Sequence, residues 1–159
     1  MYPPTAFHFK IVFKGIDDPL RLDSGFQSIS GLEAHTDKKL HETSEGSGSS
    51  QDEPGYSVLV LRRAARNYNE SPLLRWIFSH FNKTNSDPLP EAQIELLDDN
   101  HNPFMVWTIL RIIPKSWVLG ELNAEKSEIL IETIELYYEQ LTPIYASPKK
   151  QVRKKKPKQ

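Results

Sequence analysis

The sequence predicts a mainly β fold (α+β), with two packed antiparallel sheets that form a small sandwich or barrel flanked by one α-helix. Three observations support this prediction. Short runs rich in β-branched and aromatic residues recur along the chain, with Gly, Pro, Asp and Asn between them. One segment, 71–81, has the spacing of an amphipathic helix. The connections between strands are mostly too short for parallel crossovers.

Composition indicates a single domain without thiol chemistry. The 159 residues suit one core, and the hydrophobic fraction of 38% is low enough to indicate polar segments attached to that core. Cysteine is absent, which excludes disulfides and thiolate nucleophiles. Residues 1–4 lack the basic start of a signal peptide, and no run approaches the roughly 20 apolar residues of a membrane span. We therefore expect no membrane insertion by this chain.

Charge is distributed unevenly along the chain. Seven of the 20 Lys and Arg residues lie in 149–159, which leaves 13 against all 21 Asp and Glu residues, a net charge of −8 for the rest. A dense run of like charges beside prolines is typical of a solvated segment. We expect a folded domain over residues 1–147 and a disordered basic segment over 148–159.

The first 40 residues predict two strands. Apolar residues alternate with other residues over 7–13, which indicates a half-buried strand with its aromatic side chains inward. Residues 26–32 predict a shorter strand, in which Gly31 indicates a bulge or a bend. Residues 33–40 are polar with scattered apolar residues, a pattern that fits a weak strand or a loop.

A polar stretch then separates these strands from the next apolar run. Residues 42–55 contain no large apolar side chain, so we expect a mobile loop. Residues 56–61 are apolar on both faces and predict a strand that ends at Arg62 and Arg63. We expect one edge of this strand to stay unpaired in a single copy of the chain.

The dipeptide Ser71-Pro72 is the clearest helix start in the sequence. Ser can accept hydrogen bonds from the free N–H groups of the first turn, and Pro suits the first helical position. The apolar stripe of this helix consists of Leu73, Leu74, Ile77, Phe78 and Phe81.

The stretch 91–141 organises the rest of the fold. Residues 92–97 and 104–113 predict a hairpin closed by the polar turn 98–102. An irregular connection is expected after Pro114. Residues 129–138 fit both a strand and a helical spacing, and their isoleucines and tyrosines favour the strand. The residues that we expect in the core are Phe9, Phe26, Ile77, Phe81, Trp107, Trp117 and Ile134.

No pattern in the sequence predicts an active site. His35 and His41 match no metal-ligand spacing, and Ser47-Gly48-Ser49 lacks the strand-to-helix turn of a nucleophile elbow. The pair Asp98-Asp99 serves a turn more readily than acid–base chemistry. We expect a protein that is not an enzyme and that has no metal site and no cofactor. The basic segment alone leaves nucleic-acid binding as an alternative, because lysines neutralise phosphates without regard to sequence.

Four fragments, in the same order along the chain, resemble the tail tube protein family of contractile phages and phage-tail-like contractile injection systems. The fragments are Phe26-x-x-Ile29-Ser30-Gly31-Leu32-Glu33, the strand 56–63 ending in Leu61-Arg62-Arg63, the turn 94–103, and a block from Trp107 through Pro114-x-x-Trp117 and Leu122-Asn123-Ala124 to 128–139. The resemblance covers residues 7–141.

The resemblance implies a structural subunit of a hollow inner tube. Six copies would form a ring, and stacked rings would lie inside a contractile sheath and join a spike and baseplate, with cargo in the lumen. Assembly would take place in the bacterial cytoplasm, as part of a phage tail or a phage-tail-like particle. The basic segment and residues 66–70 depart from the family pattern, so the specialised ring that initiates the tube stays an alternative.

The resemblance also implies which residues meet neighbouring copies. Segments 33–40 and 56–63 would form a lumen-lining hairpin that joins adjacent copies by strand pairing, and the loop 42–55 would contact the next ring. The implied ring and lumen residues are Glu33, His35, Asp37, Lys39, Tyr56, Val58, Leu59, Val60, Leu61 and Arg62. The implied inter-ring residues are Glu45, Gly46, Asp52 and Glu53.

Overall fold

The computed structural model describes residues 8–36 and 55–144. The predictions made for Phe7, for most of the loop 42–55 and for the basic segment fall outside these residues. In the described part of the chain, no helix combines the length and the apolar character that crossing a bilayer requires.

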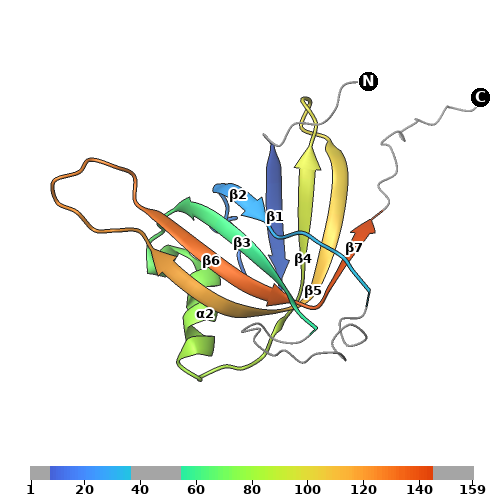
Figure 1. The fold of residues 1–159 in the computed structure, drawn as a ribbon, viewed down its shortest axis with the longest axis horizontal. Coiled ribbons are helices and arrows are strands. Elements are labelled where there is room, and N and C mark those ends of the chain that lie inside the picture. The colour runs from blue at the N-terminus through green and yellow to red at the C-terminus, as the bar shows by residue number, and fades with distance from the viewer. Residues whose placement is uncertain (1–7, 37–54, 145–159) are drawn as a thin grey trace, which may run out of the picture.

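Seven antiparallel strands and one α-helix form the fold (Figure 1). The elements are β1 (Phe9–Lys14), β2 (Phe26–Ser30), β3 (Ser57–Ala64), the 3-10 turn η1 (Tyr68–Glu70), α2 (Pro72–Phe81), β4 (Leu89–Leu97), β5 (Pro103–Leu119), β6 (Ile131–Tyr138) and β7 (Gln140–Ile144). Hydrogen bonds connect the strands in the order β1-β4-β5-β6-β3-β2, and β7 also pairs with β5. The predicted mainly β class with one flanking helix is confirmed.

Strand β5 belongs to two sheets. Up to Ile112 it pairs with β4 on one side and β7 on the other, and we call this group with β1 sheet A. From Ile113 onward it pairs with β6, and we call this group with β3 and β2 sheet B. Arg111, with a φ of 53°, lies at the corner between the sheets.

The expected irregular connection after Pro114 is wrong, because β5 continues to Leu119. A register shift between Pro114 and Ser116 accommodates the proline, which has no N–H to give to the ladder. The strand predicted for 129–138 is confirmed and begins at Ile131. Its side chains alternate strictly between buried and half-buried positions.

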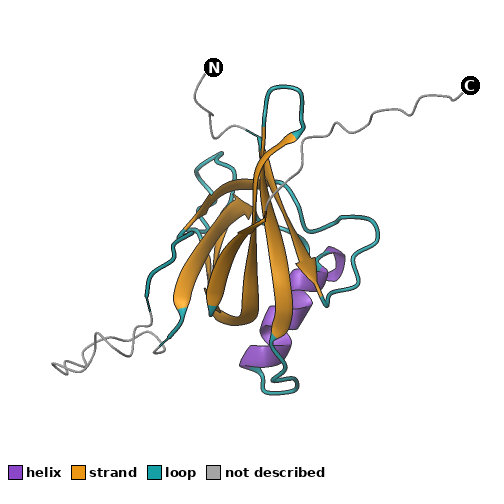
Figure 2. Cartoon of the chain, turned by 90° about the vertical axis from the view of Figure 1, so that its right-hand side faces the viewer, coloured by secondary structure: helices purple, strands orange, loops and turns teal. Residues whose placement is uncertain are grey.

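Sheets A and B pack their apolar faces against each other, and α2 covers the apolar face of sheet B (Figure 2). The helix begins where the sequence predicts, since Ser71 accepts a hydrogen bond from Leu74 N and Pro72 occupies the first turn. Of the expected core residues, Ile77 and Ile134 are fully buried, and Phe26, Trp107 and Trp117 pack against the core while partly exposed. Phe9 is half-buried.

Phe81 corrects the expected core. Its side chain is 38% exposed, because it lies in the last turn of α2 with only Phe78 as a ring neighbour. Strand β3 requires a second correction. It runs to Ala64 and pairs with β2 on one side and β6 on the other, so the expected unpaired edge is wrong.

Candidate assembly surfaces

A buried charge network lies on the inner face of sheet B. The guanidinium of Arg63 is fully buried and donates to Glu132 Oε2 at 2.7 Å, to Asp23 Oδ1 at 2.9 Å and to Ser71 Oγ at 3.1 Å. It also lies 4.8 Å from the centre of the Phe26 ring. These contacts join β3, β6, β2, the helix start and the loop before β2.

The two carboxylates of this network have further donors. Asp23 accepts from Leu73 N at 2.7 Å and from Ser71 Oγ at 2.5 Å, so it caps the start of α2. Glu132 accepts from Trp117 Nε1 at 3.0 Å. Buried charges that are paired and hydrogen-bonded in this way fix one arrangement of the elements that carry them.

The sequence reasoning missed this network, although the chain contained a signal for it. Arg63 has the same strand parity as the buried residues Leu59 and Leu61, and Glu132 has the same parity as Ile134 and Leu136. An Arg and a Glu at core positions of two strands indicate a buried ion pair.

A second set of contacts fixes the segment after β2. Tyr138 Oη donates to Gly31 O at 2.7 Å and accepts from Glu33 N at 3.0 Å. Burial raises the pKa of Tyr138 above its ordinary value. Gly31 has a φ of +95°, and a Cβ there would lie 2.0 Å from Val58 O, so the close approach of this segment to β3 requires glycine.

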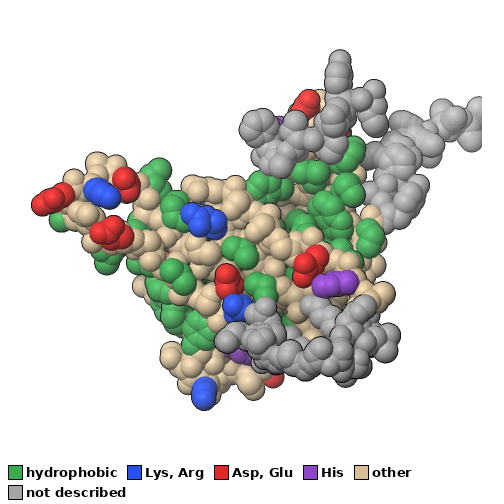
Figure 3. Space-filling view, viewed as in Figure 1, with side chains coloured by type: hydrophobic (Ala, Val, Ile, Leu, Met, Phe, Trp, Pro, Cys, Tyr) green, Lys and Arg blue, Asp and Glu red, His purple; other side chains and the backbone are tan. Residues whose placement is uncertain are grey.

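The outer face of sheet B carries no helix, since α2 lies behind β5 and β6 in Figure 1. Small hydroxyl side chains and a few valines cover this face, and few charged side chains lie over β3 and β6 in the same view (Figure 3). By strand parity and register the face includes Ser28, Ser30, Val58, Val60, Arg62, Ser116, Val118, Thr133, Glu135 and Tyr137.

Both margins of sheet B lack a strand partner within the described residues. One margin is the outer edge of β2, which pairs only with β3. The other is the edge of β5 from Ile113 to Leu119, because β4 ends its pairing at Ile112. Unpaired strand edges are sites where another chain can add a strand.

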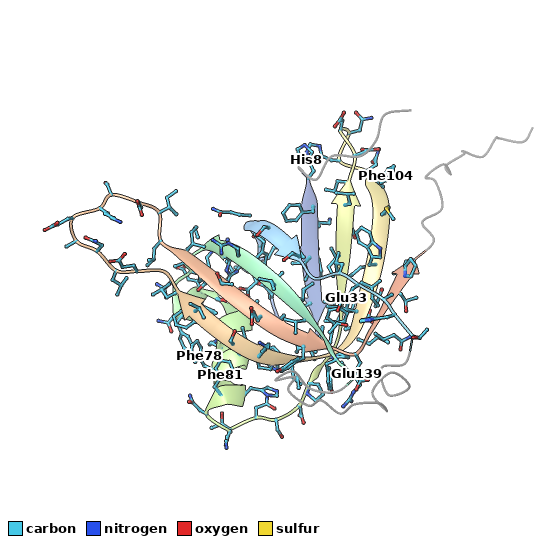
Figure 4. The ribbon with its side chains drawn as sticks, in the orientation of Figure 1. His8, Glu33, Phe78, Phe81, Phe104 and Glu139 are labelled. Atoms are coloured by element: carbon cyan, nitrogen blue, oxygen red, sulfur yellow. The ribbon has the colours of Figure 1, made fainter. Side chains whose placement is uncertain are left out.

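Exposed apolar side chains gather on two projections. Residues 120–130, which we call the arm, extend between β5 and β6 away from the body (Figure 1). Leu122 and Ile129 in the arm are 75% and 72% exposed. At the β4–β5 tip, Phe104 and Met105 are about two-fifths exposed, and Figure 4 shows Phe104 next to the turn.

The β4–β5 tip confirms the turn predicted for 98–102. Asp98 Oδ1 accepts from the backbone N–H groups of Asn100 and Asn102 at 2.8 and 2.9 Å. This carboxylate therefore stabilises the turn. In residues 8–36 and 55–144, no three His, Asp or Glu side chains are placed to hold a metal ion.

The implied ring and lumen residues occupy three different places. Val58, Val60 and Arg62 lie on the outer face of sheet B, whereas Leu59 and Leu61 are fully buried in the core. Tyr56 precedes β3, and its ring lies 5.8 Å from that of Tyr137.

Glu33 and His35 lie at the end of sheet B, in a segment without strand pairing over 31–36. Figure 4 shows Glu33 at the same end of the sheet as Glu139. The partner of β3 in the hairpin is β2 rather than the segment 33–40, which corrects the implied pairing. Asp37, Lys39, Glu45, Gly46, Asp52 and Glu53 lie outside the described residues.

Sequence comparison identifies one family. A family model described as T4-like virus tail tube protein gp19 matches residues 5–142. No curated protein matches the sequence.

Solved structures of similar fold come from contractile particles and secretion systems. The chain is similar to a chain of the PVC sheath-tube complex of an extracellular contractile injection system, with 17% identity, a TM-score of 0.63 and coverage of 91% of this chain and 93% of that chain. It is similar to a chain of the anti-feeding prophage baseplate, with 21% identity, a TM-score of 0.57 and coverage of 91% and 97%. Hcp1 from Flavobacterium johnsoniae has 10% identity, a TM-score of 0.51 and coverage of 86% and 94%.

Proposed function

The chain belongs to the T4-like virus tail tube protein family, and from this premise we propose that six copies form a ring through sheet B and that stacked rings form the inner tube of a contractile injection system. The role is structural and not catalytic. The tube lies inside a contractile sheath, joins a spike and baseplate at one end, and is assembled in the bacterial cytoplasm.

The two open margins of sheet B carry this proposal. Sheet B has four strands, each antiparallel to the next, so its margin strands β2 and β5 run in opposite directions. When β2 of one copy meets β5 of the next, the pairing is again antiparallel and the alternation continues without a break. Repetition around a ring then leaves no open margin in this sheet.

The same arrangement assigns the two faces of sheet B. Its inner face is covered by α2 and sheet A, so the outer face lines the lumen. Serine and threonine hydroxyls on that face suit a water-filled channel. Glu33, His35, Asp37, Lys39 and Tyr56 then lie toward one rim of the ring.

Contacts between rings require other surfaces. The arm and the β4–β5 tip expose Leu122, Ile129 and Phe104, which contact in water would leave unfavourably hydrated. We assign these residues to contacts between copies. Glu45, Gly46, Asp52 and Glu53 are proposed to contact the adjacent ring.

Cross-linking between paired cysteines tests the margin contact, because the native chain contains no cysteine. A variant with Ser30→Cys in β2 and Val118→Cys in β5, treated with a short bis-maleimide, should give a ladder of cross-linked species that ends at the hexamer. The control variant combines Ser30→Cys with Arg75→Cys, an exposed position on α2.

Electron microscopy of the same samples provides the second readout. We expect six-fold rings or tubes. Rings that form while the Ser30–Val118 variant gives no ladder would show that other edges close the ring. A protein that stays monomeric at high concentration would refute the proposed assembly.

A further inference from the structure

Charges on the outer face of sheet B are almost entirely neutralised within the chain. Lys115 Nζ lies 3.1 Å from Glu135 Oε1, and Ser116 Oγ donates to the same oxygen at 3.2 Å. Lys115 also lies 5.9 Å from the centre of the Tyr137 ring. This lysine and this glutamate therefore present little net charge to a neighbouring molecule.

Arg62 is the exception on this face. Its guanidinium is exposed, and its contact in the described residues is Thr133 Oγ1, 3.5 Å from Nη1. Its cross-strand neighbours are Ser28 on β2 and Thr133 on β6, both neutral. Glu135, the nearest carboxylate along β6, is held by Lys115. Arg62 thus has no acidic partner among residues 8–36 and 55–144.

We propose that Arg62 forms a belt of guanidinium groups around the lumen and that this belt binds the carboxylates of acidic protein cargo. The proposal rests on the proposed function, because symmetry places every Arg62 of one ring at the same height. A guanidinium stays charged at all relevant pH values and can hold a carboxylate through two hydrogen bonds. One exposed pair is weak, but several on one cargo chain act together.

The single charge per copy favours protein cargo over nucleic acid. Surfaces that bind nucleic acid expose several unpaired Lys or Arg side chains and often aromatic rings on which bases stack. Here the neighbouring lysine is neutralised, and the row across the sheet at Arg62 contains Ser28, Thr133 and Val118. The remaining hydroxyl surface gives a cargo chain little to bind, so it can slide between belts.

The test uses assembled tubes of the full-length chain. Electron microscopy first establishes that wild type, Arg62→Gln and the control Lys10→Gln all form tubes, so a failure of assembly is recognised as a failure of the proposed function. Lys10 lies on the outer face of sheet A and its loss removes the same charge elsewhere. Fluorescein-labelled polyglutamate and a thymidine oligonucleotide of similar charge are then titrated at low ionic strength.

We expect Arg62→Gln to weaken polyglutamate binding by about tenfold and Lys10→Gln by less than about twofold. Cryo-electron microscopy should show density at the height of Arg62 in the lumen of wild-type tubes with polyglutamate and none in Arg62→Gln tubes, which separates lumen binding from binding to the basic segment. Equal affinity and equal lumen density in wild type and Arg62→Gln would overturn the proposal. Lumen density with the oligonucleotide but not with polyglutamate would overturn it as well.

Discussion

Two adjacent arginines on β3 occupy opposite faces of sheet B and have opposite surroundings. Arg63 is fully buried, with two carboxylates, a hydroxyl and an aromatic ring around its guanidinium. Arg62 faces outward and has one long contact to a threonine. The comparison teaches that strand parity, and not residue type, decides whether a charge stabilises this fold or remains available to another molecule.

The largest expected effect comes from breaking the buried side of this comparison. Replacing Arg63 with Met leaves Asp23 and Glu132 buried without their cation, so the free energy of unfolding should fall by about 3–5 kcal/mol. Urea denaturation at fixed protein concentration measures this change, since assembly also contributes to stability. Arg62→Met is the matched control. A loss below about 1 kcal/mol for Arg63→Met would contradict the role of the network.

Ser71 sharpens the comparison at the point where the network meets the helix. Its hydroxyl accepts from Leu74 N and from Arg63, and it donates to Asp23. Ser71→Ala should lower the free energy of unfolding by about 1–2 kcal/mol, because these partners lose a contact in a buried site. Ser79→Ala, within the same helix, should be close to neutral. Equal effects in the two variants would argue against a capping role.

Tyr138 provides a pH-dependent prediction on the inner face. Burial raises its pKa in the folded state, so its contribution to stability is complete below the unfolded-state value of about 10 and is lost as the pH rises through the folded-state value. Tyr138→Phe should lower stability near neutral pH by about 1 kcal/mol and reduce the loss above pH 10. Denaturation curves between pH 7 and pH 11 would measure both effects; parallel pH profiles would contradict the prediction.

The smallest expected effect belongs to the outward-facing side. Arg62→Gln should change the free energy of unfolding by no more than about 0.5 kcal/mol, since only an exposed 3.5 Å contact is lost. The same urea titration measures it. A loss above about 1 kcal/mol would show that Arg62 supports the fold and would remove the contrast with Arg63.

Local patterns in the sequence predict most elements of this fold. The alternation over 7–13, the Ser71-Pro72 start and the turn at Asp98 each depend on neighbouring residues, so they can be read directly from the chain. Pairing is different. That β3 lies between β2 and β6 depends on contacts with residues distant in sequence, so the expected free edge of β3 was wrong.

The candidate assembly surfaces divide in the same way. Val58, Val60 and Arg62 share one face because strands alternate, and this could be predicted from the chain. The open margin of β5 could not, because a proline at 114 usually ends a strand and only the bulge beside it lets the strand continue. The buried Arg63 was missed because a pair of arginines after an apolar run resembles the end of a strand.

The continuity of β5 through both sheets has a mechanical consequence. A load applied to the exterior of a particle reaches sheet A first, and the covalent backbone at Arg111 carries it into sheet B without crossing a noncovalent joint. The ion pair between Arg111 and Glu139 braces this elbow at 3.1 Å. Outer layer and channel wall must therefore travel as one rigid piece when the tube is thrust forward.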